Sequence, residues 1–365
     1  MSRILMLGNS KLVIFGFRGE LIEKLVSLGN EVYVSFPNGP FGEGEQVSKE
    51  YGCHFIETEI DRRGKNPFKD LKILKAYKKI IKKIKPDYIL SFTVKCNIYG
   101  GMAAKKYNIP FIPNITGLGK GLYEKGLTQK ITKFLYRKGI KKSKAVFFQN
   151  ESDMQFFKDN KLFKGKCELL PGSGVNLEKY SYTELPKDDV VKFLFSGRLM
   201  KAKGIEEYLY AAERIKEKYL NTEFHICGYC EENYKSRVDD LNLKGIVKYH
   251  GLVDDVKEYY KNCHCIVLPS FHPEGISNVL LEAAATGRAI ITTNHVGCKE
   301  TVNNNLTGYL MEPKNKDELV DLIDRFINLS FDSKVEIGKN GRLKMEKEFD
   351  RNIVVNKYLS YISEA

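Results

Sequence analysis

Short apolar runs alternate with longer segments of helical periodicity along the whole chain of 365 residues. The apolar runs predict buried strands near residues 2–7, 31–36, 53–57, 87–91, 110–115, 144–149, 166–170, 191–196, 223–227, 246–250, 264–268, 289–292 and 308–311. The segments between and after them predict helices near residues 17–28, 68–84, 98–106, 126–140, 151–158, 204–218, 231–241, 254–261, 277–286, 315–328, 332–348 and 351–363. Strands that alternate with helices form parallel sheets with helices on both faces, so we predict an α/β fold.

The length of the chain and one polar break divide this alternation into two series. A chain of this length exceeds one ordinary core, and residues 171–189 are rich in Gly, Pro and polar side chains. We therefore expect two Rossmann-like, doubly wound domains, residues 1–176 and 177–349, with a cleft between them. Ligands of such sheets bind outside the carboxyl ends of the strands, so the loops after the strands are candidates for chemistry.

Positive charge is concentrated in the first half of the chain. The net charge is +13, and residues 1–176 hold 32 Lys and Arg against 16 Asp and Glu. Residues 62–85 carry 11 basic side chains and one acidic, and residues 120–144 carry nine and one. Apolar residues recur at helical spacing in the first of these segments, which predicts an amphipathic basic helix. That helix is either a solvated outer helix or a surface for anionic lipid; no recognised motif supports nucleic acid as its partner.

The apolar runs indicate in which cellular compartment the protein lies, and the cysteines raise the question of a metal site. No apolar run approaches the ~18 residues that cross a bilayer, and the polar stretch at residues 8–11 interrupts the first run early for a signal peptide. We therefore expect a cytoplasmic protein. The pairs Cys227-x-x-Cys230 and Cys263-x-Cys265 could bind zinc, but Cys227 ends one apolar strand and Cys265 begins another. That placement favours ordinary buried thiols and no metal site.

One loop of the second domain has two cations suited to a diphosphate. After the strand at 191–196, Gly197-Arg198 opens the loop and Lys203-Gly204 leads into a helix. Arg offers a fork for phosphate oxygens and Lys a point charge, and the amides at the helix N-terminus add to both. The ending of a Walker A loop is absent, so the alternative is a plain turn with two surface cations.

A second loop, PEGISN at residues 273–278, leads from the strand at 264–268 into the next helix. Ser277 is a suitable N-cap, and Gly287 a suitable end for that helix. We expect free amides there to form a second anion site, with Glu274 beside it as a possible helix-dipole partner. The amides are those of Gly275, Ile276, Ser277 and Asn278.

Glu282 stands inside the helix that follows, between Leu281 and Ala283. It could be an exposed helix carboxylate. However, this helix is expected to pack into its domain, and a carboxylate placed there needs hydroxyl groups or a cation as partner.

A third glycine-rich stretch follows the first strand and runs from Gly8 to Gly19, with Gly16 and Arg18 in it. Glycines at such a point let a ligand approach the backbone. The G-x-G-x-x-G fingerprint of dinucleotide-binding proteins is missing.

Two motifs together resemble those of the retaining glycosyltransferases of family 4. They are G-R-x4-K-G, from Gly197 to Gly204, and E-x7-E, from Glu274 to Glu282. The resemblance covers essentially the whole chain and implies the GT-B fold, with the C-terminal helix, 350–365, returning to the N-terminal domain. Further stretches resemble bacterial enzymes of capsule, O-antigen and N-glycan assembly, including lipid-linked-oligosaccharide N-acetylgalactosaminyltransferases: residues 92–104, 114–122, 146–153, 170–177 and 274–293.

The resemblance implies a role for each residue of the donor site. Glu282 would bind the ribose hydroxyls, and Glu274 would lie by the donor sugar and its diphosphate. Arg198 and Lys203 would hold that diphosphate together with the amides of the second loop, and Leu252 and Val253 would contact the base through their backbone. Cations and a helix N-terminus aimed at the leaving diphosphate stabilise its growing charge. We therefore expect retention of the anomeric configuration and no metal cofactor.

Six residues of the N-terminal domain are candidates for the acceptor or the cleft, because they follow predicted strands. Each is equally readable as ordinary loop chemistry. Relatives often have proline at position 96 and an aromatic residue at 120 or 121, and the second departure leaves the identity of the acceptor open. They often have a histidine at 94 or 95, and its absence here leaves the acceptor-activating base unassigned. The six are Gly16, Arg18, Lys95, Asn97, Thr116 and Gly117.

We therefore expect an enzyme that moves a hexose or N-acetylhexosamine from a nucleotide sugar, UDP-linked, to a glycan on undecaprenyl diphosphate. The reaction would serve bacterial surface polysaccharide or glycan assembly at the inner face of the plasma membrane, with the basic N-terminal domain on anionic lipid. One alternative keeps the fold and changes the reaction, as in an epimerase. Another is a non-enzymatic basic protein that binds membrane.

Overall fold

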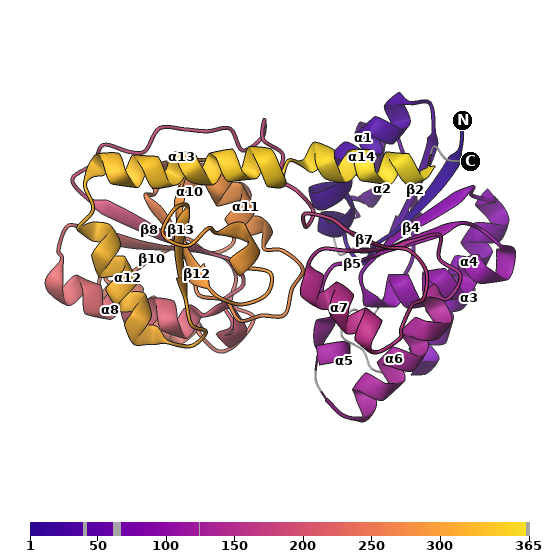
Figure 1. Cartoon of the computed structure of the whole chain (residues 1–365), viewed down its shortest axis with the longest axis horizontal. Coiled ribbons are helices and arrows are strands. Elements are labelled where there is room, and N and C mark those ends of the chain that lie inside the picture. The colour runs from indigo at the N-terminus through magenta and orange to yellow at the C-terminus, as the bar shows by residue number, and fades with distance from the viewer. Residues whose placement is uncertain (39–41, 61–66, 124, 363–365) are drawn as a thin grey trace. The chain divides into compact units, whose positions relative to one another are not determined.

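The computed structural model describes residues 1–38, 42–60, 67–123 and 125–362. The chain forms two compact units, each built on one parallel sheet (Figure 1). The first unit comprises Met1–Ser173, Pro273–Gly275 and Arg351–Ala365, and the second comprises Gly174–His272 and Ile276–Asp350. The first boundary falls three residues before the position expected from the sequence.

The first unit has a seven-stranded sheet in the order β3-β2-β1-β4-β5-β6-β7. Its strands are β1 (Arg3–Leu7), β2 (Glu31–Phe36), β3 (His54–Glu57), β4 (Tyr88–Phe92), β5 (Phe111–Ile115), β6 (Val146–Phe148) and β7 (Cys167–Leu169). Its helices are α1 (Phe17–Ser27), α2 (Gly44–Glu50), α3 (Pro67–Ile84), α4 (Gly101–Tyr107), α5 (Gly119–Tyr123), α6 (Leu127–Ile140), α7 (Glu151–Asp159) and α14 (Arg351–Ile362), with π-helical turns η1 (Leu12–Gly16) and η2 (Cys96–Gly100).

Each face of this sheet has its own hydrophobic core, because successive strand residues point to opposite faces. Ile4 and Met6 of β1 belong to the cluster that includes α1 and α14 residues. Leu5 and Leu7 belong to the cluster on the other face, with residues of α3, α4 and α6. Helices accordingly cover both faces of the sheet (Figure 1).

The second unit has a six-stranded sheet in the order β10-β9-β8-β11-β12-β13. Its strands are β8 (Val191–Ser196), β9 (Thr222–Cys227), β10 (Lys248–Tyr249), β11 (Cys265–Leu268), β12 (Ala289–Thr293) and β13 (Gly308–Met311). Its helices are α8 (Ile205–Lys218), α9 (Lys235–Leu243), α10 (Lys257–Asn262), α11 (Asn278–Ala285), α12 (Lys316–Ile327) and α13 (Phe331–Glu348), with 3₁₀ turns η3 (Lys201–Lys203) and η4 (Lys299–Thr301).

The predicted strands and helices are all present, and the predicted α/β class with two parallel sheets is confirmed. The sequence did not indicate α2, α5, η1, η3 or η4, and it indicated η2 only in part, through the helix predicted at 98–106. Residues 62–66 of the basic segment and residue 363 of the last helix lie outside the described residues. Within the part of the chain that the structure describes, no helix has the length and apolar character of a membrane span.

The glycine-rich stretch after β1 is a correction to the sequence analysis. We expected a loop before the helix predicted at 17–28, but the chain is already helical from Leu12, as η1, which leads directly into α1. Gly16 has ordinary helical dihedrals, with φ of −67°. The physical reason is apolar burial, because Ile14 and Phe15 of this segment pack into the core and hold it as a helix.

Candidate functional site

Glycine backbone joins the carboxyl ends of β8, β9 and β10 in the second unit. The Gly197 amide donates to the Cys227 carbonyl at 2.9 Å, and the Gly228 amide donates to the Gly251 carbonyl at 2.7 Å. A Cβ on Gly228 would lie 1.8 Å from the Gly197 carbonyl oxygen, and its φ of +145° also favours glycine. The loops that follow these three strands are thus held as one surface. Gly197 belongs to a motif predicted from the sequence, whereas Gly228 belongs to none.

The loop with the two candidate cations is fixed against the loop that follows β11. Gly204 begins α8 with φ of +80°, and a Cβ there would meet the Pro269 carbonyl oxygen at 2.2 Å. The Phe271 amide donates to the Ala202 carbonyl at 2.9 Å. These contacts place Lys203, which is buried, beside the strand end that leads towards α11.

Arg198 lies in the same loop and is partly exposed. Its Nη1 donates to the Glu231 carboxylate at 2.6 Å. A guanidinium has five N–H groups in a fixed fork, so this bond to one carboxylate oxygen sets its orientation without using all of its donors. Glu231 is a positioning residue that sequence reasoning missed.

Two of the four amides that we expected to be free before α11 are already bonded. The Gly275 amide donates to the Thr116 carbonyl at 3.1 Å, and the Ser277 amide donates to the Gly297 carbonyl at 2.8 Å. Ser277 stands at the N-cap position in an extended conformation, with no capping bond from its side chain. The expectation of four free amides is therefore wrong for Gly275 and Ser277, because backbone carbonyls outside the helix take them. The amides of Ile276 and Asn278 remain the candidates for an anion.

Glu282 is half-buried on α11, and it has the hydroxyl partner that its position calls for. The Tyr260 hydroxyl donates to Glu282 Oε2 at 3.2 Å. Burial, and then the Glu282 carboxylate, raise the pKa of Tyr260 well above its usual value, so this hydroxyl stays a proton donor. No sequence motif pointed to Tyr260, which lies on α10 and reaches the site only through the fold.

Glu274 belongs with the first unit, and so does Gly275. A Cβ on Gly117, whose φ is +127°, would lie 3.1 Å from the Gly275 nitrogen and 3.2 Å from the Glu274 Cα. Asn150 Nδ2 donates to the Gly275 carbonyl at 3.1 Å. The structure therefore places Thr116 and Gly117 next to Glu274. The sequence had indicated these residues as candidates in two separate stretches. Asn150 was not among the predicted residues.

Three other acceptor candidates have side chains that contact groups within the protein. Arg18 is buried in α1, stacks over the Phe92 ring at 4.9 Å from its centre, and has a pKa lowered chiefly by burial. Asn97 is buried in η2; its Oδ1 accepts from the Ser91 hydroxyl at 2.7 Å, and its Nδ2 donates to the Asn114 carbonyl at 2.8 Å. The Asn97 side chain thus links the ends of β4 and β5, whereas Arg18 contacts the last residue of β4 from α1. Lys95 is ion-paired with Asp70 at 2.6 Å.

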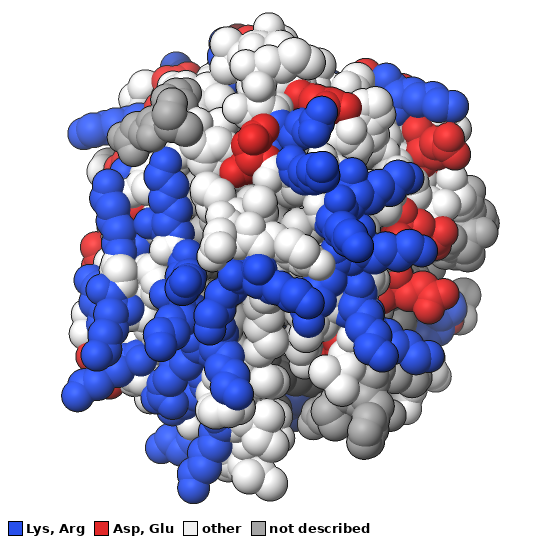
Figure 2. Space-filling model, turned by 90° about the vertical axis from the view of Figure 1, so that its right-hand side faces the viewer, with Lys and Arg blue, Asp and Glu red and all other residues white. Residues whose placement is uncertain are grey.

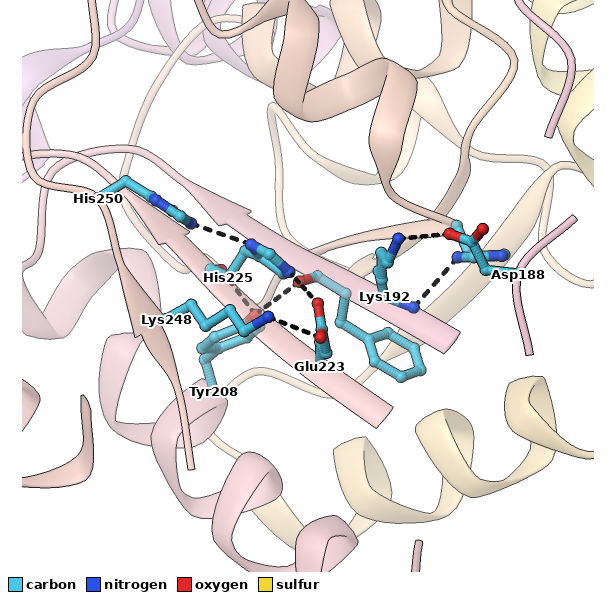
Figure 3. A network of polar contacts seen from close by, with 9 residues as sticks. Asp188, Lys192, Tyr208, Glu223, His225, Lys248 and His250 are labelled. Atoms are coloured by element: carbon cyan, nitrogen blue, oxygen red, sulfur yellow. Dashed lines mark hydrogen bonds and ion pairs between the residues drawn. The ribbon is translucent and has the colours of Figure 1, made fainter. Parts of the chain in front are cut away.

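The loop expected to contact a nucleotide base follows β10. Gly251 turns with φ of +68°, Leu252 is exposed, and Val253 packs on the core of the second unit. The residue before this loop, His250, is the last of a row of polar side chains in contact with one another, which we call the polar chain (Figure 3). No sequence motif indicated it. The polar chain runs along one face of β9 and β10.

Four side chains form this polar chain. Lys248 Nζ and His225 Nε2 both contact the Glu223 carboxylate, at 2.6 and 3.0 Å, and His225 Nδ1 lies 3.0 Å from His250 Nε2 (Figure 3). A carboxylate only accepts, so His225 donates through Nε2 and accepts at Nδ1 from His250. Burial lowers the pKa of both imidazoles, which keeps them neutral near pH 7. A cavity of about 360 Å³ adjoins the chain, lined by Lys192, Glu223, His225, His250, Glu258, Tyr259, Asn262 and Cys263.

The cysteines are free thiols throughout. Burial raises the pKa of Cys227 and of Cys263 to about 12, so both stay protonated and act as small apolar groups. Within residues 1–38, 42–60, 67–123 and 125–362, no three His, Cys, Asp or Glu side chains gather as a metal ion would require.

Comparison with known proteins gives matches in both halves of the chain. Residues 178–344 match the family model described as Glycosyl transferases group 1, and residues 3–150 match Glycosyl transferase 4-like. A solved structure, a glycosyltransferase from Rickettsia africae, aligns with a TM-score of 0.81 at 23% identity and covers 100% of this chain and 98% of that one.

Two curated relatives have named activities. The N,N'-diacetylbacillosaminyl-diphospho-undecaprenol alpha-1,3-N-acetylgalactosaminyltransferase of Campylobacter jejuni is 28% identical, over 98% of this chain and 97% of that protein. The UDP-Gal:alpha-D-GlcNAc-diphosphoundecaprenol alpha-1,3-galactosyltransferase of Escherichia coli is 27% identical, over 77% of this chain and 76% of that protein.

Proposed function

Because the chain belongs to the GT-B glycosyltransferases, with a glycosyl transferase 4-like first domain and a group 1 second domain, we propose that it extends a lipid-linked glycan. The donor is a nucleotide sugar, UDP-linked, and the acceptor is a sugar on undecaprenyl diphosphate in bacterial glycan assembly. The names of both curated relatives specify such an acceptor, and one specifies a UDP sugar. The transferred sugar is a hexose or N-acetylhexosamine.

One observation of this structure supports the donor side most directly. The loop with Arg198 and Lys203 is bonded to the loop after β11, which leads to Glu282 on α11. Two cations and a hydroxyl-paired carboxylate therefore lie at the carboxyl edge of one sheet, where such folds bind nucleotides. The cations suit the diphosphate, and the carboxylate suits the two ribose hydroxyls.

The same residues account for the chemistry that we propose. Negative charge grows on the nucleoside diphosphate as its bond to the sugar breaks. Arg198 and Lys203 stabilise that charge in the transition state more than in the bound substrate, which is the condition for catalysis. We propose a metal-independent reaction with retention at the anomeric carbon, and Glu274 beside the donor sugar.

The acceptor lies in a membrane, so the enzyme must work at a membrane surface. We propose peripheral association through the basic first domain. Basic residues near an anionic surface contribute about 1 kcal/mol each, and residues 1–176 hold an excess of them.

Calorimetric titration with UDP, GDP and ADP tests the donor site. We expect one nucleotide, UDP, to bind, and Lys203→Ala and Glu282→Ala each to weaken it by more than about 1.5 kcal/mol, the size of a lost charged hydrogen bond. Lys201→Ala is the matched control, because Lys201 lies in the same turn but is exposed and paired with Glu206 at 3.3 Å. Folded wild-type protein that binds none of the three nucleotides would contradict the proposal.

A further inference from the structure

Helix α6 has apolar side chains on two opposite faces. On one face Tyr136 and Ile140 are fully buried in the core of the first unit. On the other, Leu127, Ile131 and Phe134 are 74%, 50% and 51% exposed. Their spacing of four and three residues aligns them in one stripe along the helix. An amphipathic helix that packs on a core needs only one apolar face, so the second is unexplained by folding.

A further large apolar side chain is exposed shortly before the helix in the sequence. Tyr123, the last residue of α5, is 54% exposed and stands four residues before Leu127. Large exposed apolar side chains gathered in this way mark interaction sites more often than single ones do.

Cations surround this stripe. Residues 125–144 contain eight Lys and Arg and no Asp or Glu. Lys138 follows Phe134 by one turn and holds its ammonium 4.5 Å from the centre of the Phe134 ring. Figure 2 shows a face of the molecule on which Lys and Arg gather, most densely at its lower left, while Asp and Glu lie mainly along its top and right-hand side. The exposed cations nearest in helical position to the stripe are Lys130, Arg137, Lys138, Lys141 and Lys142.

The other basic helix lacks this combination. The apolar residues of α3 that the sequence analysis considered for lipid binding are mostly in the core, and Leu71 alone among those described is largely exposed. Helix α3 can add charge to a surface, but its apolar face is used in folding. The buried residues are Ile73, Tyr77, Ile80, Ile81 and Ile84.

We propose that α6 is the membrane-contacting element, and that it lies in the surface of an anionic bilayer. Leu127, Ile131 and Phe134 enter the boundary between headgroups and acyl chains. The flanking lysines reach back to the anionic headgroups along their apolar stems. An apolar stripe with aromatic residues and a cationic border is the pattern of interfacial helices. The inference rests on the proposed function, because it concerns the membrane that holds the lipid-linked acceptor.

Charge selects lipid over a second protein as the occupant. A protein partner would need a matching acidic apolar groove, whereas a bilayer of anionic lipid presents negative charge above apolar chains everywhere. The 14 residues of α6 make a helix about 21 Å long, which suffices to lie along such a surface.

Sedimentation of the full chain with vesicles tests the proposal. Vesicles contain 30 mol% phosphatidylglycerol in phosphatidylcholine, or phosphatidylcholine alone. We expect binding to the anionic vesicles only, weakened at least tenfold in the triple variant Leu127→Ser, Ile131→Ser, Phe134→Ser. The matched control, Leu220→Ser, Leu243→Ser, Leu343→Ser, removes side chains that are 89%, 87% and 60% exposed in the second unit, and should bind as the wild type does.

A variant with fewer lysines separates the electrostatic contribution to vesicle binding from the apolar contribution. Each basic residue near the surface contributes about fivefold in affinity, so Lys130→Gln, Lys138→Gln, Lys141→Gln should weaken binding about a hundredfold. The loss should shrink at high salt, where the lysines are screened. The apolar triple variant should keep most of its defect at high salt.

Several results would overturn the proposal. One is an α6 triple variant that binds vesicles as the wild type does. Another is a wild-type dimer in lipid-free sedimentation velocity that the α6 variant abolishes, which would make the stripe a subunit contact. UDP titration of the same proteins separates this inference from the proposed function. Lost vesicle binding with UDP binding intact supports α6, and absent UDP binding in the wild type counts only against the transferase.

Discussion

At the scale of single residues, His264 is a buried imidazole whose one ring proton is held on Nε2 by its hydrogen bonds. Its Nε2 donates to the Pro186 carbonyl at 3.1 Å, and its Nδ1 accepts from the Lys192 amide at 3.1 Å. A second proton, on Nδ1, would point at the backbone N–H group of Lys192, which now donates to that nitrogen. Burial lowers the pKa of His264 from 6.5 to about 4.

Acid should therefore destabilise the second unit through this residue. The unfolded chain takes up the proton near pH 6.5 and the folded chain only near pH 4, so the stabilisation is complete above pH 6.5 and is lost as pH falls towards 4. We expect His264 to account for about 2 kcal/mol of unfolding free energy lost between pH 7 and pH 5, measured by urea denaturation.

The variant His264→Asn isolates this contribution. Asn keeps an acceptor for the Lys192 amide and cannot titrate, so the loss between pH 7 and pH 5 should shrink by about 2 kcal/mol. His225 and His250, whose pKa values are also lowered by burial, keep their part of the slope. An unchanged slope in the variant would show that His264 is already charged in the folded state at pH 5.

At the scale of elements, Gly228 tests whether the strand ends must be joined by glycine. Gly228→Ala would place a methyl group 1.8 Å from the Gly197 carbonyl at a φ that L residues rarely adopt. We expect a loss of stability of at least about 2 kcal/mol, from strain and from displacement of the β8 loop. UDP affinity should fall with it, because Arg198 and Lys203 lie in that loop. Thermal unfolding and calorimetry measure the two effects.

Gly245→Ala is the control for strain alone. Gly245 also has a positive φ, +69°, but an added Cβ would meet nothing within 4 Å. Its substitution should cost about 1–2 kcal/mol and leave UDP affinity unchanged. Equal losses of affinity in the two variants would mean that the close approach of Gly228 has no role in the site.

The elements also show where sequence patterns are informative. Runs of apolar residues predicted β2 (Glu31–Phe36), β8 (Val191–Ser196) and β13 (Gly308–Met311) to the residue, because most residues of each run are buried. Helix α2 was missed because it is short and polar, with only Gly44 and Ser48 buried.

The same contrast holds within the candidate site. The motif residues Arg198, Lys203 and Glu282 could be named from the sequence, since their residue types and spacing suit a diphosphate and a ribose. Tyr260 could not, because its contact with Glu282 spans 22 positions and depends on how α10 and α11 pack. Nor could the bonds that occupy the Gly275 and Ser277 amides, since their acceptors, Thr116 and Gly297, lie in other loops.

At the scale of the whole molecule, the last helix belongs to the unit in which the chain began. Residues of α14 are buried in the cluster that also contains Ile4 and Met6. Arg351 binds the Glu20 carboxylate at 2.7 Å, and Tyr358 accepts from Asn114 Nδ2 at 2.8 Å. The first unit is therefore complete only when synthesis has reached its final helix.

Tyr358→Ala should test this dependence, because we expect a loss of stability that is confined to the first unit. Tyr358 is fully buried, with its ring centre 4.9 Å from that of Phe147, so truncation should cost the first unit about 3–5 kcal/mol. The two units have separate cores, so the second should be unaffected. Hydrogen exchange should show faster exchange in β1 to β7 and unchanged protection in β8 to β13.

Tyr358→Phe keeps the packing and should cost about 1–3 kcal/mol, for the buried Asn114 amide left without its acceptor. Equal loss of protection in both sheets would mean that the units unfold together, and that α14 stabilises the chain as one body.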